Sequence, residues 1–164
     1  MHRYFLGIRA FLLIGVVVAT GSLAAGCGGG SGIEVETGDL TKAEFIKRAN
    51  GVCGAIRLQF ARDFSNYYRD HSPKQVGSEE KWAEEVVDRA VVPNYEVRLI
   101  DRFSTLGVPS AEKDEVVAFL EAVQQQVDKM QENANELTKS PFPFAKPAKL
   151  ARKQGLTRCA DAFG

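Results

Sequence analysis

The clearest helical pattern in the chain lies in residues 110–137, which read SAEKDEVVAFLEAVQQQVDKMQENANEL. Apolar residues recur in it at alternating spacings of four and three, the period of a helix that buries one narrow face. Ser110 is a good N-cap, and Glu112 and Asp114 suit a first turn, where the helix dipole favours carboxylates. The apolar positions are Val116, Leu120, Val123, Val127, Met130, Ala134 and Leu137. We expect a long helix here that packs against other helices.

Residues 41–69 show the same period. Thr41 and Glu44 form a capping box, in which each residue satisfies a backbone N–H of the first turn. The sequence His71-Ser72-Pro73 ends the pattern, because proline cannot continue a helix. The apolar positions are Phe45, Ala49, Val52, Ile56, Phe60, Phe64 and Tyr67.

A third helix is expected to begin near Ser78 and to close at residues 106–109, which read Leu-Gly-Val-Pro. Pro93 lies inside it. Because proline lacks a backbone N–H and clashes with the preceding turn, we expect a kink or a break near Val91 and Val92. The inner face is predicted to comprise Trp82, Val86, Ala90, Val97, Ile100 and Phe103.

The C-terminal part is rich in proline. Residues 140–147, SPFPFAKP, are predicted to be non-helical, and a short helix is expected from Pro147 to Gln154 with Gly155 as its cap. Residues 156–164 are expected to form a tail. Phe142 and Phe144 either plug one end of the domain, which we favour, or form an interaction loop with exposed anchors for a partner.

No stretch alternates well enough to indicate a sheet. We therefore predict an all-α fold, an antiparallel bundle of three long helices and one short C-terminal helix, with the second helix kinked near Pro93.

The charge of the chain is nearly balanced. The first 33 residues contain no Asp or Glu, so beyond them 19 basic residues face all 21 acidic ones, a formal net charge of −2. This balance argues against nucleic acid as a partner, since nucleic-acid binders usually carry a marked basic excess.

The first 26 residues have the three parts of a secretory signal peptide. Residues 1–9 are basic, residues 10–19 (AFLLIGVVVA) are apolar, and residues 20–26 are small. A transmembrane helix would need about 20 apolar residues, and this run is shorter.

Leu23-Ala24-Ala25-Gly26-Cys27 resembles the bacterial lipobox, although Ala24 stands where leucine is commonest. The resemblance implies cleavage before Cys27 and a diacylglycerol, with acyl chains such as palmitate, on its sulfur. Two or three such chains anchor a protein firmly. We therefore expect a signal peptide at 1–26, a lipidated Cys27 with a flexible Gly/Ser tether at 27–40, and a helical domain at 41–164 on the extracytoplasmic face of the cell membrane.

Three further segments extend this resemblance. They are residues 45–53 (FIKRANGVC), 106–109 (LGVP) and 155–159 (GLTRC), which look like parts of the small uncharacterised lipoproteins of actinobacteria. The resemblance supports the membrane address and a cysteine pair, and it implies no catalytic residue.

Cys53 and Cys159 are the two cysteines that remain once Cys27 is assigned to lipid. In an oxidising compartment only one intramolecular pairing is then possible, and we predict a disulfide. The alternatives are two free thiols, a metal site, which would need more ligands than His71 offers, and a redox pair, which is more often Cys-x-x-Cys.

No catalytic, metal or cofactor site stands out. His71 and Met130 could ligate haem, but a helix end and an apolar seam are ordinary places for them. The acidic residues 79–88 are interleaved with Lys81 and Arg89 and read as a solvated helix face. We expect no enzyme, and a membrane-anchored domain that binds an envelope protein or a small ligand. The alternatives are an envelope enzyme or its accessory subunit, and a structural spacer.

Overall fold

The computed structural model describes residues 32–138 and 143–163. Over these residues the fold is all-α, as predicted, and contains no strand beyond one isolated bridge between Thr37 and Val108. The α-helices are α1 (Lys42–Asp70), α2 (Pro73–Val76), α3 (Glu79–Val86), α4 (Ile100–Ser104), α5 (Lys113–Glu132), α6 (Ala145–Lys153) and α7 (Thr157–Ala162). A π-helix, η1 (Val87–Leu99), joins α3 to α4, and two 3₁₀ turns are η2 (Ser110–Glu112) and η3 (Ala134–Thr138).

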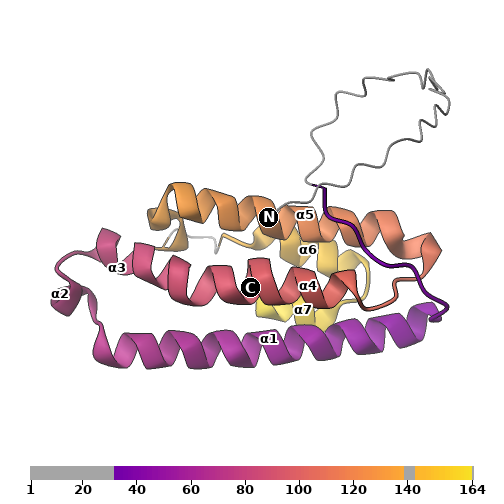
Figure 1. Ribbon diagram of the computed structural model, residues 1–164, viewed down its shortest axis with the longest axis horizontal. Helices are drawn as coiled ribbons and strands as arrows, with labels where there is room; N and C mark the ends of the chain where they lie inside the picture. The colour runs from indigo at the N-terminus through magenta and orange to yellow at the C-terminus, as the bar shows by residue number, and fades with distance from the viewer. Residues whose placement is uncertain (1–31, 139–142, 164) are drawn as a thin grey trace, which may run out of the picture.

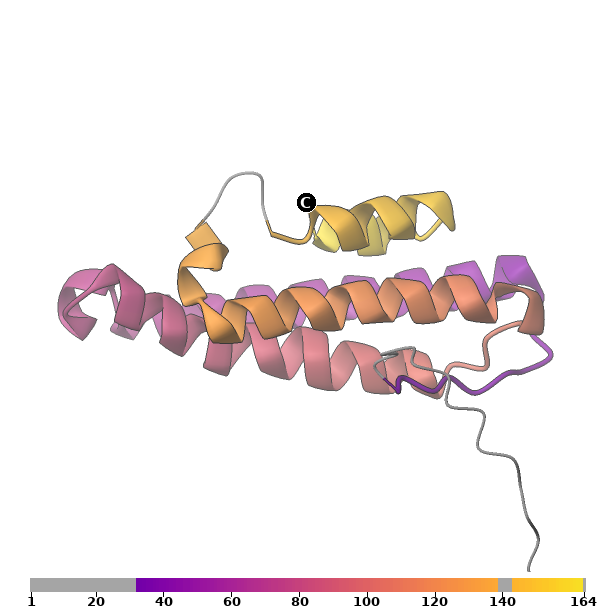
Figure 2. The ribbon, with the colours of Figure 1, turned by 90° about the horizontal axis from the view of Figure 1, so that it is seen from above.

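Three rods run side by side along the long axis of the molecule (Figures 1 and 2). They are α1, the continuous rod formed by α3, η1 and α4, and α5, and each runs opposite to the one before it. η1 packs against both α1 and α5. The short helices α6 and α7 pack on α5 and α1 respectively, so the C-terminal end of the chain lies over these two rods.

Helix α1 begins and ends where the sequence predicts. The Thr41 hydroxyl accepts a hydrogen bond from the Glu44 backbone N–H, and Glu44 bonds the Thr41 backbone N–H in return. Its buried positions include Phe45, Ala49 and Ile56, as expected.

Pro93 does not break the second rod into two segments. The chain passes through it as the π-helix η1, in which the wider turn accommodates a residue that has no N–H to donate. Of the predicted inner face, Val86, Ala90 and Phe103 are fully buried, whereas Val97 is 59% exposed, so the prediction is wrong at Val97. The other buried positions of η1 are Val87, Val91, Asn94, Tyr95 and Leu99.

Helix α5 carries the predicted seam, and Val116, Leu120, Val123, Val127 and Met130 are all buried. Two details differ from the prediction. Ser110 is not the N-cap, because residues 110–112 form the 3₁₀ turn η2 and Glu112 occupies the cap position. The α-helix also ends at Glu132, before the apolar pattern does. The last two positions of the pattern, Ala134 and Leu137, therefore lie in η3.

Residues 33–40 are not a flexible tether. The Glu36 N–H donates to the Ser104 carbonyl over 2.7 Å, and the Val108 N–H donates to the Glu36 carbonyl over 2.8 Å. Val35 is buried against the core. The folded domain therefore begins near Ile33 rather than at Thr41, held by backbone hydrogen bonds to the α4–η2 connection.

The C-terminal segment also differs from the prediction. Helix α6 begins at Ala145, two residues before Pro147, which lies in its first turn. Gly155 has the expected cap geometry, with φ +79°. The expected tail is instead helix α7 followed by the buried Phe163. It folds because it docks on α1, a contact that local sequence does not reveal.

Candidate anion-binding site

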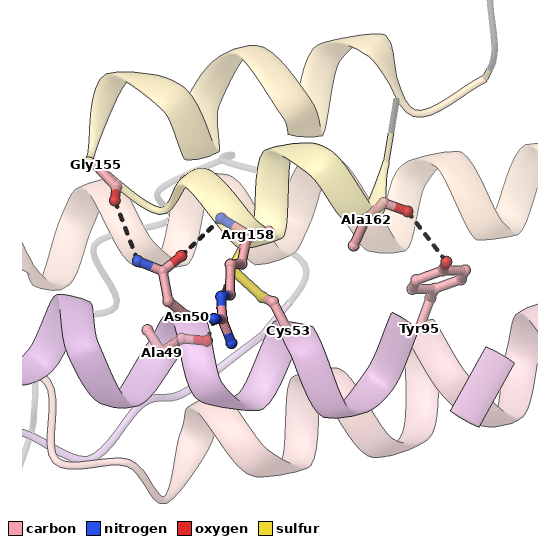
Figure 3. Close-up of a disulfide and its surroundings, with 8 residues drawn as sticks. Ala49, Asn50, Cys53, Tyr95, Gly155, Arg158 and Ala162 are labelled. Atoms are coloured by element: carbon pink, nitrogen blue, oxygen red, sulfur yellow. Dashed lines mark hydrogen bonds between the residues drawn. A yellow bond between two sulfur atoms is a disulfide. The ribbon is translucent and has the colours of Figure 1, made fainter. Parts of the chain in front are cut away.

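Cys53 of α1 and Cys159 of α7 form the predicted disulfide, with a Cα–Cα distance of 4.8 Å (Figure 3). Asn50, one turn before Cys53, adds a second connection between α1 and the C-terminal segment. Its side chain accepts a hydrogen bond from the Arg158 backbone N–H over 2.8 Å and donates one to the Gly155 carbonyl over 3.3 Å. The first turn of α7 is thus capped by a side chain from α1.

The other residues singled out in the sequence do not form a common site. Cys27 and Phe142 lie outside the described residues. Phe144 is fully buried and packs on Tyr95 and Phe163, which fits the favoured interpretation of a plug and leaves this ring unavailable to a partner.

The two candidate haem ligands have ordinary surroundings. Met130 is buried in the core, and the His71 ring stacks on Tyr67 at a centroid distance of 4.7 Å. Within residues 32–138 and 143–163, no group of three or more His, Cys, Asp and Glu side chains is arranged to hold a metal ion. None of the helices in these ranges combines the length and apolarity that a membrane span requires.

The acidic stretch at 79–88 is engaged with its neighbours. Glu85 accepts a hydrogen bond from the Tyr67 hydroxyl over 2.8 Å and lies 3.7 Å from Arg89. Burial and this hydrogen bond raise the pKa of Tyr67 to about 12.

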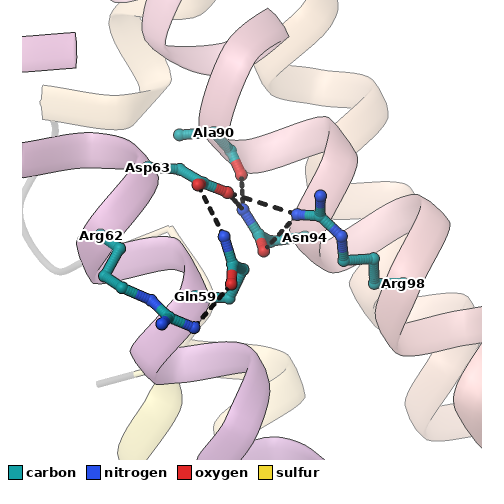
Figure 4. Close-up of polar contacts among 6 residues, drawn as sticks. All are labelled: Gln59, Arg62, Asp63, Ala90, Asn94 and Arg98. Atoms are coloured by element: carbon teal, nitrogen blue, oxygen red, sulfur yellow. Dashed lines mark hydrogen bonds and ion pairs between the residues drawn. The ribbon is translucent and has the colours of Figure 1, made fainter. Parts of the chain in front are cut away.

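A polar network that sequence reasoning missed joins α1 to η1 (Figure 4). Asn94 is fully buried, and its side-chain amide donates to Asp63 over 2.9 Å and to the Ala90 carbonyl over 2.8 Å. The Arg98 guanidinium donates to the Asn94 side-chain oxygen over 2.9 Å and to Asp63 over 3.3 Å. The network therefore fixes one arginine against α1.

Gln59 extends this network along α1. Its amide donates to Asp63 over 2.7 Å, and its oxygen accepts from the Arg62 guanidinium over 2.7 Å. Burial on its own would raise the pKa of Asp63, but hydrogen bonds from Asn94 and Gln59 and the nearby charge of Arg98 outweigh it and lower that pKa. Asp63 is therefore a carboxylate around which Asn94, Gln59 and Arg98 are oriented.

The network forms one side of an open pocket of about 280 Å³ between α1 and the η1–α4 rod. Three arginines converge on this pocket from three elements. Arg62 comes from α1, Arg98 from η1 and Arg102 from α4. Arg102 forms no hydrogen bond or ion pair with any described residue. The remaining lining residues are Val52, Ala55, Ile56 and Gln59.

Three guanidiniums facing one carboxylate leave this pocket with an excess of positive charge. Guanidinium groups bind carboxylate and phosphate oxygens through paired hydrogen bonds, and they keep their charge at any physiological pH. The pocket can therefore hold an anion. The sequence gives one weak signal for it, the spacing of four between Arg98 and Arg102, but nothing in the sequence brings Arg62 to them.

Comparison of the chain with models of protein families, with curated proteins and with solved structures yields no match in any of the three. The class of the protein is therefore defined by its own fold and site, an all-α domain clamped by a disulfide with an arginine-lined pocket on one flank of α1.

Proposed function

We propose that this chain is a lipid-anchored protein of the extracytoplasmic membrane face whose helical domain binds a phosphate-bearing anion between α1 and α4. The observation that carries the proposal is the convergence of Arg62, Arg98 and Arg102 on one pocket. This clustering occurs in a region, residues 34–164, whose formal net charge is −2. A local excess of arginine in such a domain is a specific feature rather than a property of the whole surface.

Phosphate suits this pocket better than carboxylate does. A carboxylate is planar and offers two oxygens, whereas a terminal phosphate is tetrahedral and offers three. Arginines that approach from three elements can each contact a different oxygen of a tetrahedral anion. The polar groups of the lining are arginines and Gln59, which supply contacts for a bound anion.

Binding of inorganic phosphate to the full processed chain in detergent, measured by titration calorimetry, tests the pocket. Arg62→Gln and Arg102→Gln are each expected to weaken binding at least about 10-fold, since each removes a charged contact of roughly 1.5–3 kcal/mol. Arg152→Gln, an exposed arginine of α6 outside the pocket, is the matched control and should leave the affinity unchanged. Failure of phosphate to bind, or an equal loss in the control, would contradict the proposal and favour a structural spacer.

The anchor is tested separately by the mass of the membrane-bound protein. The expected mature chain begins at Cys27 and carries the mass of two or three acyl chains. Cys27→Ala should abolish acylation and leave the precursor uncleaved. A mature chain with another N-terminus, or without acyl mass, would show that Cys27 is not lipidated.

A further inference from the structure

A second basic pocket lies on the other flank of α1. It has a volume of about 500 Å³ and lies between α1 and α7. Arg57 of α1 and Arg158 of α7 supply its positive charge, and Asp161 is the one acidic residue in its lining. Neither arginine side chain forms a hydrogen bond or an ion pair within the described part of the chain. The other lining residues are Gly54, Leu58 and Ala61.

The two pockets face the two sides of the same stretch of α1. Residues 54, 57, 58 and 61 line the second pocket, and residues 52, 55, 56, 59 and 62 line the first. At 100° per residue these two sets form stripes on the two flanks of α1. The pockets therefore lie at the same height along α1 and are separated by about one helix diameter, roughly 10 Å.

The surface of α1 that separates the two pockets carries mostly small side chains. It includes Gly51, Ala55 and Leu58, of which the first two have almost no side chain. A Cβ atom added at Gly51 would meet nothing within 4 Å, so this glycine is not required for packing. Leu58 is 66% exposed and is the only large side chain among these three. A ligand that crosses α1 from one pocket to the other therefore passes Leu58 and otherwise meets residues that have almost no side chain.

The Arg158 side chain lies against α1 at Gly54, in the lining of the second pocket. A Cβ atom added at Gly54 would lie 3.4 Å from a terminal nitrogen of its guanidinium, so the side chain lies directly against the backbone of α1. Figure 3 shows the Arg158 side chain extending from α7, beside the disulfide, toward α1. The disulfide and the Asn50 cap thus place a positive charge beside α1.

We infer that the natural ligand is a linear polymer of repeated phosphate groups that crosses α1 and occupies both pockets at once. The inference rests on the proposed function, because the first pocket supplies one half of the contact. A single phosphate can occupy either pocket but cannot span about 10 Å. A chain of linked phosphates can, and the second contact is then made at a high effective concentration, which raises the affinity without any new type of interaction.

Calorimetry with orthophosphate and with an inorganic polyphosphate of about 10 or more units separates the two pockets. The unmodified chain should bind the polymer at least about 10-fold more tightly per molecule than orthophosphate. The double variant Arg57→Gln/Arg158→Gln should lose this advantage while its affinity for orthophosphate in the first pocket stays within about two-fold of the unmodified chain. The matched control is Lys149→Gln/Arg152→Gln on α6, which removes the same charge away from both pockets.

Each outcome decides the question. Equal affinities for polymer and orthophosphate would overturn the inference and leave the proposed function intact, whereas absence of orthophosphate binding would overturn both. An equal loss in the control would show general charge attraction in place of a two-pocket site. Tighter binding of polyglutamate than of polyphosphate would overturn the assignment to phosphate. Arg57→Gln alone, which leaves α7 untouched, gives the same test if the double variant fails to fold.

Discussion

Asn94 is the residue through which the fold and the candidate site meet. It follows Pro93 in the π-helix and is fully buried. Its side-chain NH₂ group donates hydrogen bonds to Asp63 and to the Ala90 carbonyl, and its side-chain oxygen accepts one from Arg98. A buried amide is tolerated when its donors and acceptor are satisfied, and here they are satisfied by the groups that orient Arg98. The irregular helical turn and the arginine pocket are therefore parts of one arrangement.

The Asp63 carboxylate predicts how stability depends on pH. Its pKa in the folded protein lies below the ordinary value of 3.8. The stability that it contributes is therefore present above that ordinary value and is lost as the pH falls through the lower, folded pKa. We expect Asp63→Asn to reduce the free energy of unfolding by about 1 kcal/mol near neutral pH, because a neutral amide cannot pair with Arg98 in the same way.

Urea unfolding from about pH 6 down to about pH 2 checks this expectation. The gap between the unmodified chain and Asp63→Asn should close in acid, where Asp63 is protonated. Asp88→Asn removes an exposed carboxylate of the same type and should show no such closing gap. A gap that stays constant with pH would mean that Asp63 acts through packing and not through its charge.

At the scale of the elements, the π-helix sets which residues of the second rod face the core. Steps of four drift by about 40° each around an α-helix, so five such positions would spread over nearly half its circumference. In the π-helix η1 the positions Val87, Val91 and Tyr95 are all buried, and Val97 is exposed to solvent.

Substitutions at Val91 and Val97 distinguish the two registers. Val91→Asp should cost roughly 3 kcal/mol or more, because it places an unpaired carboxylate in the core. Val97→Asp should change the free energy of unfolding by about 0.5 kcal/mol or less, as at an ordinary surface site. Thermal melts of the two variants provide the measurement. If Val97→Asp were the more destabilising variant, Val97 would face the core, as the α-helical register predicts.

Features written in a few adjacent residues could be predicted from the sequence. The capping box of Thr41 and Glu44, the seam from Val116 to Met130 and the cap at Gly155 are of this kind. Each depends on the local helical period or on one turn of backbone, which a short window contains.

Features that depend on distant partners could not be predicted in this way. Helix α7 is capped by Asn50, which is 108 residues away from Arg158. The first arginine pocket needs Arg62 of α1 beside Arg102 of α4. The inner face of the second rod was wrong at Val97 because the expected period was that of an α-helix. The disulfide could be predicted although its two cysteines are far apart in the sequence, because only one pairing remained once Cys27 was assigned to lipid.

At the scale of the whole molecule, the disulfide joins the first long helix to the last short one. The two cysteines are separated by 106 positions in the sequence. Closing a loop of this size restricts the unfolded chain and contributes up to about 4–5 kcal/mol, usually less in practice. We expect Cys53→Ala/Cys159→Ala to lower the melting temperature and to loosen α7 first, while Asn50 and the buried Phe163 retain part of its docking.

Thermal melts with and without reductant check this prediction. Reductant should destabilise the unmodified chain and leave the double variant unaffected, which serves as its own control. In denatured, unreduced protein a maleimide should label neither Cys53 nor Cys159. Full labelling of both thiols in protein isolated from the membrane would mean that the bridge does not form there.

The same bridge has a mechanical consequence if the domain is anchored by its N-terminus, as we propose. Tension on the tether would first peel residues 33–40 away from the α4–η2 connection and then unwind the start of α1. At Cys53 the pull reaches the disulfide, which ties this point of α1 to α7. All five arginines of the two pockets lie between Cys53 and Cys159 in the sequence. A pull on the N-terminus can therefore unfold the residues before Cys53 without drawing apart the two ends of the loop that carries these arginines.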